Sequence, residues 1–172
     1  MFLDLIKKRR SIRKFLDKTI EKEKIDILIE AGLRSPSSKS TNPWHFIVIH
    51  NKDVLVKLSK AKPHGSSFLK NAPLGILVCA DSSVSDVWIE DASIASVFIH
   101  LAACDIGLGS CWIQFRGRKH NDQISCDRYI KAVLNIQDNL EVEALIAVGY
   151  PDEQKKGHQK ESLLVDRIRH IK

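Results

Sequence analysis

Three arginines and one serine stand within five positions near the start of the chain, in the order Arg9, Arg10, Ser11, Ile12 and Arg13. Like charges at this spacing repel one another, so the arrangement requires either open solvent or an anion that compensates the charge. A guanidinium group offers a planar set of donors that matches phosphate oxygens, and a hydroxyl adds a neutral donor. The segment is therefore either a solvated basic turn or a binding site for a phosphate group.

A second stretch, residues 35–44, has the sequence SPSSKSTNPW and is rich in hydroxyl and amide groups. Groups of this kind can form hydrogen bonds with the edge of a planar polar ring. The same composition is also typical of an ordinary loop. The sequence alone leaves both interpretations open.

The third stretch, residues 107–112, has the sequence GLGSCW. The glycines on either side of Leu108 allow the backbone to pass close to a flat ligand. A helix end followed by a strand bulge explains them equally well. The pattern G-x-G-x-x-G is absent from the sequence, so a Rossmann dinucleotide site is not supported.

Hydrophobic periodicity places these three stretches between regular elements. Helices are expected over residues 2–9, 19–35, 53–62, 86–106 and 122–135. Strands are expected over residues 44–50, 74–80, 108–115 and 142–149. Thr19 is the expected N-cap of the second helix, and Gly107 the expected end of the fourth. The alternation of strands and helices predicts an α/β or α+β sandwich, in one domain that spans residues 1–172.

The helix expected over residues 86–106 is apolar nearly all round between Ala92 and Ala103. A helix of this kind is buried on most sides, which is difficult to arrange in a monomer of 172 residues. Burial against a second copy of the chain removes the difficulty, so we expect a homodimer.

The net charge of +6 is concentrated at the two ends of the chain. Residues 1–14 carry six Lys and Arg against one acid, whereas the middle of the chain is near neutral. Basic ends can bind nucleic acid, but only 6% of the residues are aromatic and no nucleic-acid motif is present. We therefore expect no nucleic-acid partner.

Composition excludes several other classes of protein. No apolar run approaches the ~20 residues that cross a bilayer, and the N-terminus does not resemble a signal peptide, so we expect a cytoplasmic protein without membrane contact. The sequence has no C-x-x-C pair, so we expect no metal site. The expected role of the cysteines is that of small, reduced core residues; they are Cys79, Cys104, Cys111 and Cys126.

Taken together and in this order, the three stretches resemble the nitroreductase family. The matching motifs are R-R-S-I-R-x-F, P-S-S-x-x-x-x-P-W, G-L-G-S-C-W and a final G-Y-P at residues 149–151. The resemblance covers essentially the whole chain. It implies an α+β fold, an α/β sandwich whose central mixed, mainly antiparallel sheet is flanked by helices, in an intertwined homodimer.

The resemblance also implies an FMN site between the two chains. The phosphate, the ribityl chain and the pyrimidine edge would be held by Arg9, Arg10, Ser11 and Arg13. From the second chain, the flavin would be lined by Pro36, Ser37, Ser38, Ser40 and Asn42. The backbone of Leu108 and Gly109 would pass near the ring, and Lys160, in preference to Lys156, would complete the phosphate site. Ser40 and Asn42 stand where the family usually has a longer Asn and Gln.

The implied function is that of an FMN-dependent oxidoreductase. Hydride would pass from NAD(P)H through FMN to a small organic acceptor, such as a nitroaromatic or a quinone, by a ping-pong mechanism. No catalytic side chain is required. The alternative within the fold is a flavoprotein of other activity, dehalogenase-like or FMN-storing. His64 and Lys70 fall in a loop that could face the pocket, and His100 is expected to be a satisfied core or interface histidine.

Overall fold

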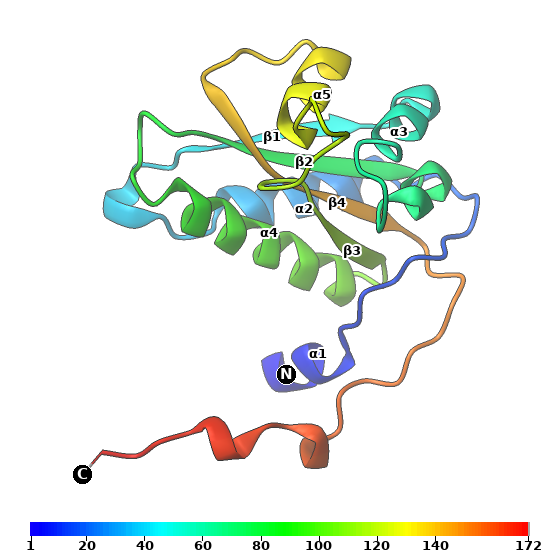
Figure 1. Cartoon of the computed structure of the whole chain (residues 1–172). Coiled ribbons are helices and arrows are strands. Elements are labelled where there is room, and N and C mark those ends of the chain that lie inside the picture. Colours follow the sequence, from blue (N-terminus) through cyan, green and yellow to red (C-terminus); the bar gives the residue numbers. More distant parts are fainter. Residues whose placement is uncertain (172) are drawn as a thin grey trace.

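The computed structural model describes residues 1–171 and has a four-stranded sheet at its centre (Figure 1). The strands are β1 (Trp44–Ile49), β2 (Leu74–Asp81), β3 (Gly109–Gln114) and β4 (Leu140–Gly149). They lie in the order β1-β2-β4-β3, and each pair of neighbours is antiparallel. The two inner strands are buried along most of their length, as their apolar sequences predict.

The expectation of a mixed sheet is wrong for these four strands, which pair only in the antiparallel sense. One parallel contact exists at the edge, an isolated bridge between Ser11 and Ser110 of β3. This contact does not extend into a fifth strand, because the next backbone N–H groups, of Arg13 and Lys14, donate to the carboxylate of Glu153 instead. The parallel pairing here is therefore limited to the single bridge between Ser11 and Ser110.

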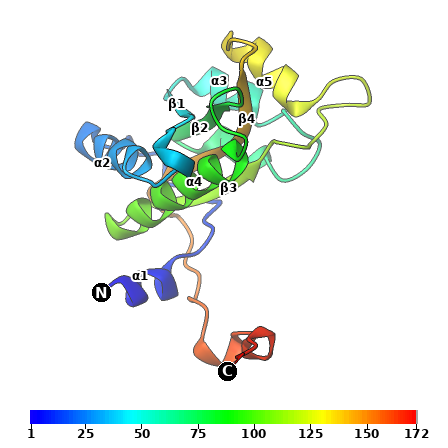
Figure 2. The ribbon, with the colours of Figure 1, turned by 90° about the vertical axis from the view of Figure 1, so that its left-hand side faces the viewer.

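Helices cover both faces of the sheet (Figure 2). One face carries α2 (Lys22–Leu33) and α4 (Trp88–Asp105), and the other carries α3 (Lys52–Leu58) and α5 (Cys126–Leu134). Successive residues of a strand point to opposite faces. Leu77 accordingly packs with α3 and α5, and Val78 packs with α2 and α4.

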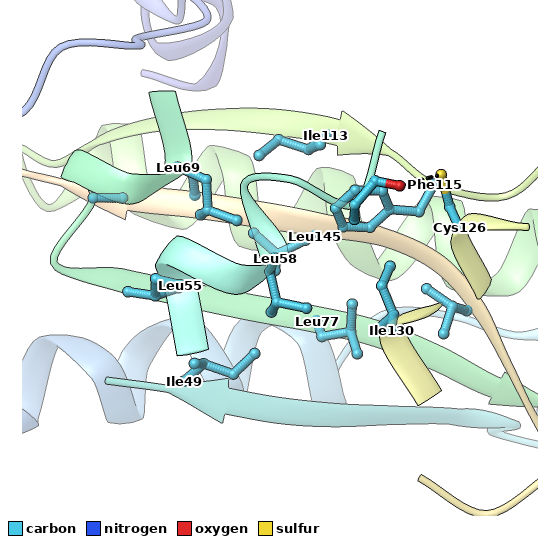
Figure 3. Packing of buried hydrophobic residues seen from close by; sticks show 14 of the residues in the cluster. Ile49, Leu55, Leu58, Leu69, Leu77, Ile113, Phe115, Cys126, Ile130 and Leu145 are labelled. Carbon is cyan, nitrogen blue, oxygen red and sulfur yellow. Dashed lines mark hydrogen bonds between the residues drawn. The ribbon is translucent and has the colours of Figure 1, made fainter. Parts of the chain in front are cut away.

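Close packing beneath α3 and α5 forms one of two hydrophobic layers (Figure 3). Leu55 and Leu58 of α3 and Ile130 of α5 rest on Leu77 and Leu145 of the sheet, and each is at most 1% exposed. Burial of a side chain of this size stabilises the fold by about 1.5–3 kcal/mol. This layer makes β3 and β4 a rigid base for the segments that lie along their edge.

Several helices are shorter than the sequence predicts. The second helix begins at Lys22 after Glu21, so Thr19 is not its N-cap. The carboxylate of Glu21 accepts a hydrogen bond from the Tyr150 hydroxyl at 2.5 Å, which fixes the chain before the first helical turn. The helix α3 ends at Leu58, because the carbonyl of Ser59 accepts from the Ser66 hydroxyl. The fifth helix begins at Cys126, with Ser125 as its N-cap, and ends at Leu134. The remaining bounds agree with prediction to within two residues.

The longest helix, α4, has 18 residues and is therefore about 25 Å long. Its inner side packs on the sheet through small residues and Ile99. On its outer side, Ile94, Val97 and Phe98 are 37–49% exposed. Gly107, with φ of 79°, follows the helix end, as predicted.

Both ends of the chain project from the sheet on the same side, as Figures 1 and 2 show. The helix α1 (Phe2–Lys8) precedes the basic segment, which we define as residues 9–13. The C-terminal arm, residues 151–171, contains only the short 3-10 helices η3 (Lys160–Ser162) and η4 (Val165–Arg167). Among residues 1–171, no helix combines the length and the apolar character that a membrane span requires.

All four cysteines carry free thiols. Cys79, Cys111 and Cys126 are buried, as predicted for core residues, and Cys104 is half-buried. Burial raises the pKa of the Cys79 thiol to about 12, so this group is neutral under ordinary conditions.

Candidate functional site

The basic segment lies along the free edge of β3, where glycine allows a close approach. The backbone N–H of Ile12 donates to the carbonyl of Ser110 at 2.9 Å, and Ile12 is buried. A Cβ on Gly109 would lie 2.8 Å from the Ile12 side chain, which is too close. The space beside Gly109 is therefore filled by the chain itself, and its approach to a flat ligand stays a prediction, as does that of the buried Leu108.

The C-terminal arm holds the basic segment from the other side. Glu153 accepts backbone hydrogen bonds from Arg13 at 2.5 Å and Lys14 at 3.3 Å. These bonds, led by the one from Arg13, lower the pKa of the Glu153 carboxyl. Lys155 pairs with Glu153 at 3.0 Å and donates to the carbonyl of Ser11 at 2.7 Å. The segment is thus fixed between a strand edge and an ion pair.

Lys155 is the arm lysine that the structure brings to the basic segment, and the sequence analysis did not select it. Lys156 contributes its carbonyl, which accepts from the guanidinium of Arg10. Lys160 lies further along the arm in η3, exposed. The signal that could have found Lys155 is its spacing of two from Glu153, which places both side chains on one side of an extended segment.

The three guanidinium groups of the basic segment are left without an acidic partner. No ion pair formed within residues 1–171 includes Arg9, Arg10 or Arg13. The Arg13 guanidinium lies 5.8 Å from the ring centroid of Phe68, in the 3-10 helix η2 (Ser67–Asn71). Guanidinium groups are donors of the kind that bind phosphate, and the assignment of this segment to a phosphate stays a prediction.

His100 of α4 supports the strand beneath the basic segment. Its Nδ1 atom lies 2.7 Å from the Ser110 hydroxyl, and its ring stacks on Trp112. Burial, with a smaller contribution from Arg9, lowers the pKa of His100 to about 4. The imidazole is therefore neutral near pH 7 and adds no charge to the cluster. The expectation of a satisfied buried histidine is confirmed.

The serine loop, residues 35–42, is fixed to the opposite end of α4. Asp91, which is 2% exposed, accepts from the backbone of Ser38 at 2.8 Å and from the Ser85 hydroxyl at 2.9 Å. Within the loop, the Ser37 hydroxyl donates to the Asn42 side chain at 2.9 Å and accepts from the Asn42 backbone. The predicted loop is confirmed. Its Ser35 is buried, and its other hydroxyl groups belong to residues that are exposed or half-buried.

Backbone strain distinguishes the serine loop from an ordinary turn. Lys39, Ser40 and Asn42 adopt positive φ values of 51°, 55° and 49°. Each such residue other than glycine costs about 1–2 kcal/mol. Strain of this kind persists where surrounding contacts fix the backbone, here those of Asp91.

The two halves of the predicted site stand apart within one chain. The basic segment, Leu108 and Gly109 meet at the C-terminal end of α4, and the serine loop meets its N-terminal end, as Figure 1 shows. Asp91, which holds the serine loop, and His100, which contacts Ser110 beside the basic segment, are nine positions apart in α4, or about 14 Å along its axis. The residues that the structure does not bring to the basic segment are Pro36, Ser37, Ser38, Ser40, Asn42 and Lys160.

Comparison with known proteins places this geometry in a family. A model of the nitroreductase family matches residues 6–64. The structure of an FMN-dependent nitroreductase from Clostridium difficile R20291 is 46% identical, with a TM-score of 0.96 over 98% of each chain.

Relatives known by sequence agree with this assignment. A Methanothermobacter thermautotrophicus protein named "Putative NADH dehydrogenase/NAD(P)H nitroreductase" is 38% identical over 154 residues, which cover 88% of this chain and 78% of the relative. An iodotyrosine deiodinase from Thermotoga neapolitana is 22% identical, with 96% of each chain covered. The resemblance noted in the sequence is confirmed, and the chain belongs to the nitroreductase family.

Proposed function

We propose that this protein is an FMN-dependent oxidoreductase that uses NAD(P)H to reduce a small organic acceptor, such as a nitroaromatic or a quinone, in a ping-pong sequence. The observation that carries the proposal is the set of three unpaired guanidinium groups fixed along the edge of β3. The relative named as a nitroreductase is 38% identical and the deiodinase 22%, which favours reduction over dehalogenation.

The residues of the basic segment fit the phosphate of FMN. Arg9 and Arg13 offer charged donors, Ser11 a hydroxyl, and Lys155 a further cation 2.7 Å from the Ser11 carbonyl. Charge-assisted hydrogen bonds of this kind are roughly twice as strong as neutral ones. One guanidinium nitrogen of Arg10 donates to the carbonyl of Lys156 in the arm. The remaining guanidinium N–H groups of Arg10 are available to a ligand.

Bound FMN would supply the hydride-accepting centre, and the protein would supply binding and orientation. Ser40 and Asn42 of the serine loop stand at the surface with the Asn42 amide partly engaged by Ser37. They offer short polar groups for the edge of the ring. The strained backbone holds these groups in place before a ligand binds, which reduces the entropy lost on binding.

We further propose that two chains form each site. The basic segment and the serine loop contact different turns of α4, nine residues apart, which favours a site that takes one of them from each chain. Exposed apolar side chains supply a surface for the second chain: those of the outer side of α4, and Leu163, Leu164 and Val165 of the arm, which are 54–66% exposed. Apolar surface of this extent is typical of a partner interface.

The experiment that tests the proposed function starts from protein purified with added FMN. We expect close to one flavin per chain, a dimer in sedimentation, and FMN-dependent oxidation of NADH or NADPH when a nitroaromatic or quinone is present. Parallel lines in double-reciprocal plots would support the ping-pong sequence. A chain that binds no FMN in titration, or oxidises neither nucleotide when loaded, would overturn the proposal.

A further inference from the structure

A cavity of about 400 Å³ lies at the far end of β3 from the basic segment. Its wall is formed by the end of β3 and by the two loops that face it. The lining residues are Lys62, Pro63, His64, Gln114, Arg118 and Lys119. The set contains three permanent cations and one histidine, and no acid.

The cations of this cavity are not neutralised by the protein. No ion pair formed within the described part of the chain includes Lys62, Arg118 or Lys119. The carboxylate nearest in the sheet, that of Glu143, is 2% exposed and pairs with Arg116 at 2.8 Å. The acid beside the cavity is thus already engaged.

Lys62 is fixed in the wall of the cavity. Its ammonium group donates to the carbonyl of Gln114 at 2.9 Å and lies 5.9 Å from the ring centroid of Phe115. Phe115 is fully buried in the core, as Figure 3 shows. Partial burial and the charge of Arg118 lower the pKa of Lys62, because both disfavour the ammonium form. An anion in the cavity would offset both effects.

The position of the cavity connects it with the proposed flavin site. Strand β3 runs from Ser110, which pairs with the basic segment, to Gln114, which lines the cavity. Three residues of the strand lie between them, so they are four steps, or about 13 Å, apart. The loop that carries His64 leads into η2, whose Phe68 lies under Arg13. The cavity and the basic segment therefore lie at the two ends of β3.

We propose that this cavity receives an oxyanion of the substrate, so that the enzyme prefers anionic substrates. The inference rests on the proposed function, and it adds the class of molecule that the site selects. The oxyanion has two possible sources, a carboxylate on the acceptor and the 2′-phosphate of NADPH. Arg118 and Lys119 supply the accessible charges, and Lys62 supplies the fixed one.

The test removes the two exposed charges in the variant Arg118→Gln/Lys119→Gln. Neither side chain forms a hydrogen bond within residues 1–171, so the fold is expected to survive. The matched control is Lys57→Gln/Arg128→Gln, which makes the same chemical change at two exposed positions outside the cavity. Both variants are loaded with FMN and compared with the unchanged protein.

Steady-state kinetics use two matched pairs of substrates, 4-nitrobenzoate with 4-nitrobenzamide and NADPH with NADH. We expect kcat/KM to fall about three- to tenfold for 4-nitrobenzoate, for NADPH, or for both, with the neutral amide unchanged within twofold. The effect should shrink at 0.3 M salt, because exposed charges are screened. A fall in kcat/KM confined to 4-nitrobenzoate identifies the acceptor as the source of the oxyanion. A fall confined to NADPH identifies the nucleotide as the source.

Equilibrium dialysis of 4-nitrobenzoate and of NADP⁺ gives a readout that does not depend on turnover. Weaker binding to the Arg118→Gln/Lys119→Gln variant than to the control supports the inference, whether or not the protein oxidises NAD(P)H. A protein that shows this weaker binding but oxidises no NAD(P)H overturns the proposed function and leaves the inference standing. An active enzyme with equal kinetics and equal binding in both variants overturns the inference and leaves the proposed function standing.

Discussion

The carboxylate of Asp91 accepts the backbone N–H of Ser38 at 2.8 Å, which fixes the serine loop to the first turn of α4. The same carboxylate accepts the Ser85 hydroxyl at 2.9 Å. One buried acid thus joins the strained loop, a neighbouring turn and the longest helix. Its position in the first helical turn is favourable for a negative charge.

Replacement of this acid should loosen the loop. We expect Asp91→Ala to lower the free energy of unfolding by about 2–3 kcal/mol, because hydrogen bonds to a buried charge are lost and the Ser38 N–H is left without its acceptor. Chemical denaturation measures the change. The control is Asp105→Ala, an exposed acid in the last turn of α4, which should change stability by less than about 0.5 kcal/mol. Equal effects from the two variants would contradict the assignment.

The phosphate assignment predicts a ligand-dependent effect of Arg13→Ala. Loss of one charge-assisted contact should weaken FMN affinity about ten- to a hundredfold. Riboflavin lacks the phosphate, so its affinity should change much less. Titrations of both ligands by flavin fluorescence provide the comparison. Equal weakening of FMN and riboflavin would show that Arg13 contacts the ring or only supports the fold.

Acid stability should depend on His100. Its pKa is about 4 in the folded protein and 6.5 for an ordinary histidine, so between these values the unfolded chain binds the proton and the folded chain does not. Stability therefore falls as the pH falls from 6.5 to 4, by about 3 kcal/mol from this group.

The variant His100→Gln should lack this component of the pH dependence, although it is less stable at pH 7. Unfolding free energies measured between pH 7.5 and 4 test the expectation. The exposed His64→Gln serves as the control for the loss of a histidine elsewhere in the chain. A slope that is the same in all three proteins would rule out a depressed pKa at His100.

The sequence predicts those features of the fold that depend on local pattern. The strands, the long helix and the stop at Gly107 follow from apolar periodicity and from the freedom of glycine to adopt positive φ. The start of α2 was missed, because Glu21 bonds to Tyr150, which is 129 positions away. No local pattern reports such a contact. The expectation of some parallel pairing in the sheet was wrong for the same reason, because the direction in which strands pair also depends on contacts between residues far apart in the sequence.

The candidate site likewise contains residues that the sequence could identify and residues that it could not. The basic segment and the serine loop could be identified from residue types, and the family motifs gave their order. Lys155 and Glu153 could not be identified in this way, because their contacts with the basic segment depend on the path of the C-terminal arm. The role of Asp91 could not be predicted either, because the helix that contains it is apolar over most of its length. Its signal was an acid, next to Glu90, in the first turn of that helix.

The proposal of a shared site makes a prediction about mixed dimers. One parent carries Arg13→Ala, and the other carries Ser40→Gly/Asn42→Gly, in which glycine keeps the positive φ and removes the polar groups. Each parent alone should bind FMN weakly, because every site has one defective half. After the two are unfolded and refolded together, random pairing makes about half of the dimers mixed, and each mixed dimer has one intact site.

Tight FMN binding should therefore return to about a quarter of the sites, measured as flavin retained after gel filtration. Each parent refolded alone is the control and should retain almost none. If one chain supplied both the basic segment and the serine loop to a single flavin, no mixed dimer would contain an intact site and binding would not return. The separation of the two groups along α4 argues against that outcome, since the residues that hold them, Asp91 and His100, are nine positions apart in the helix, or about 14 Å along its axis.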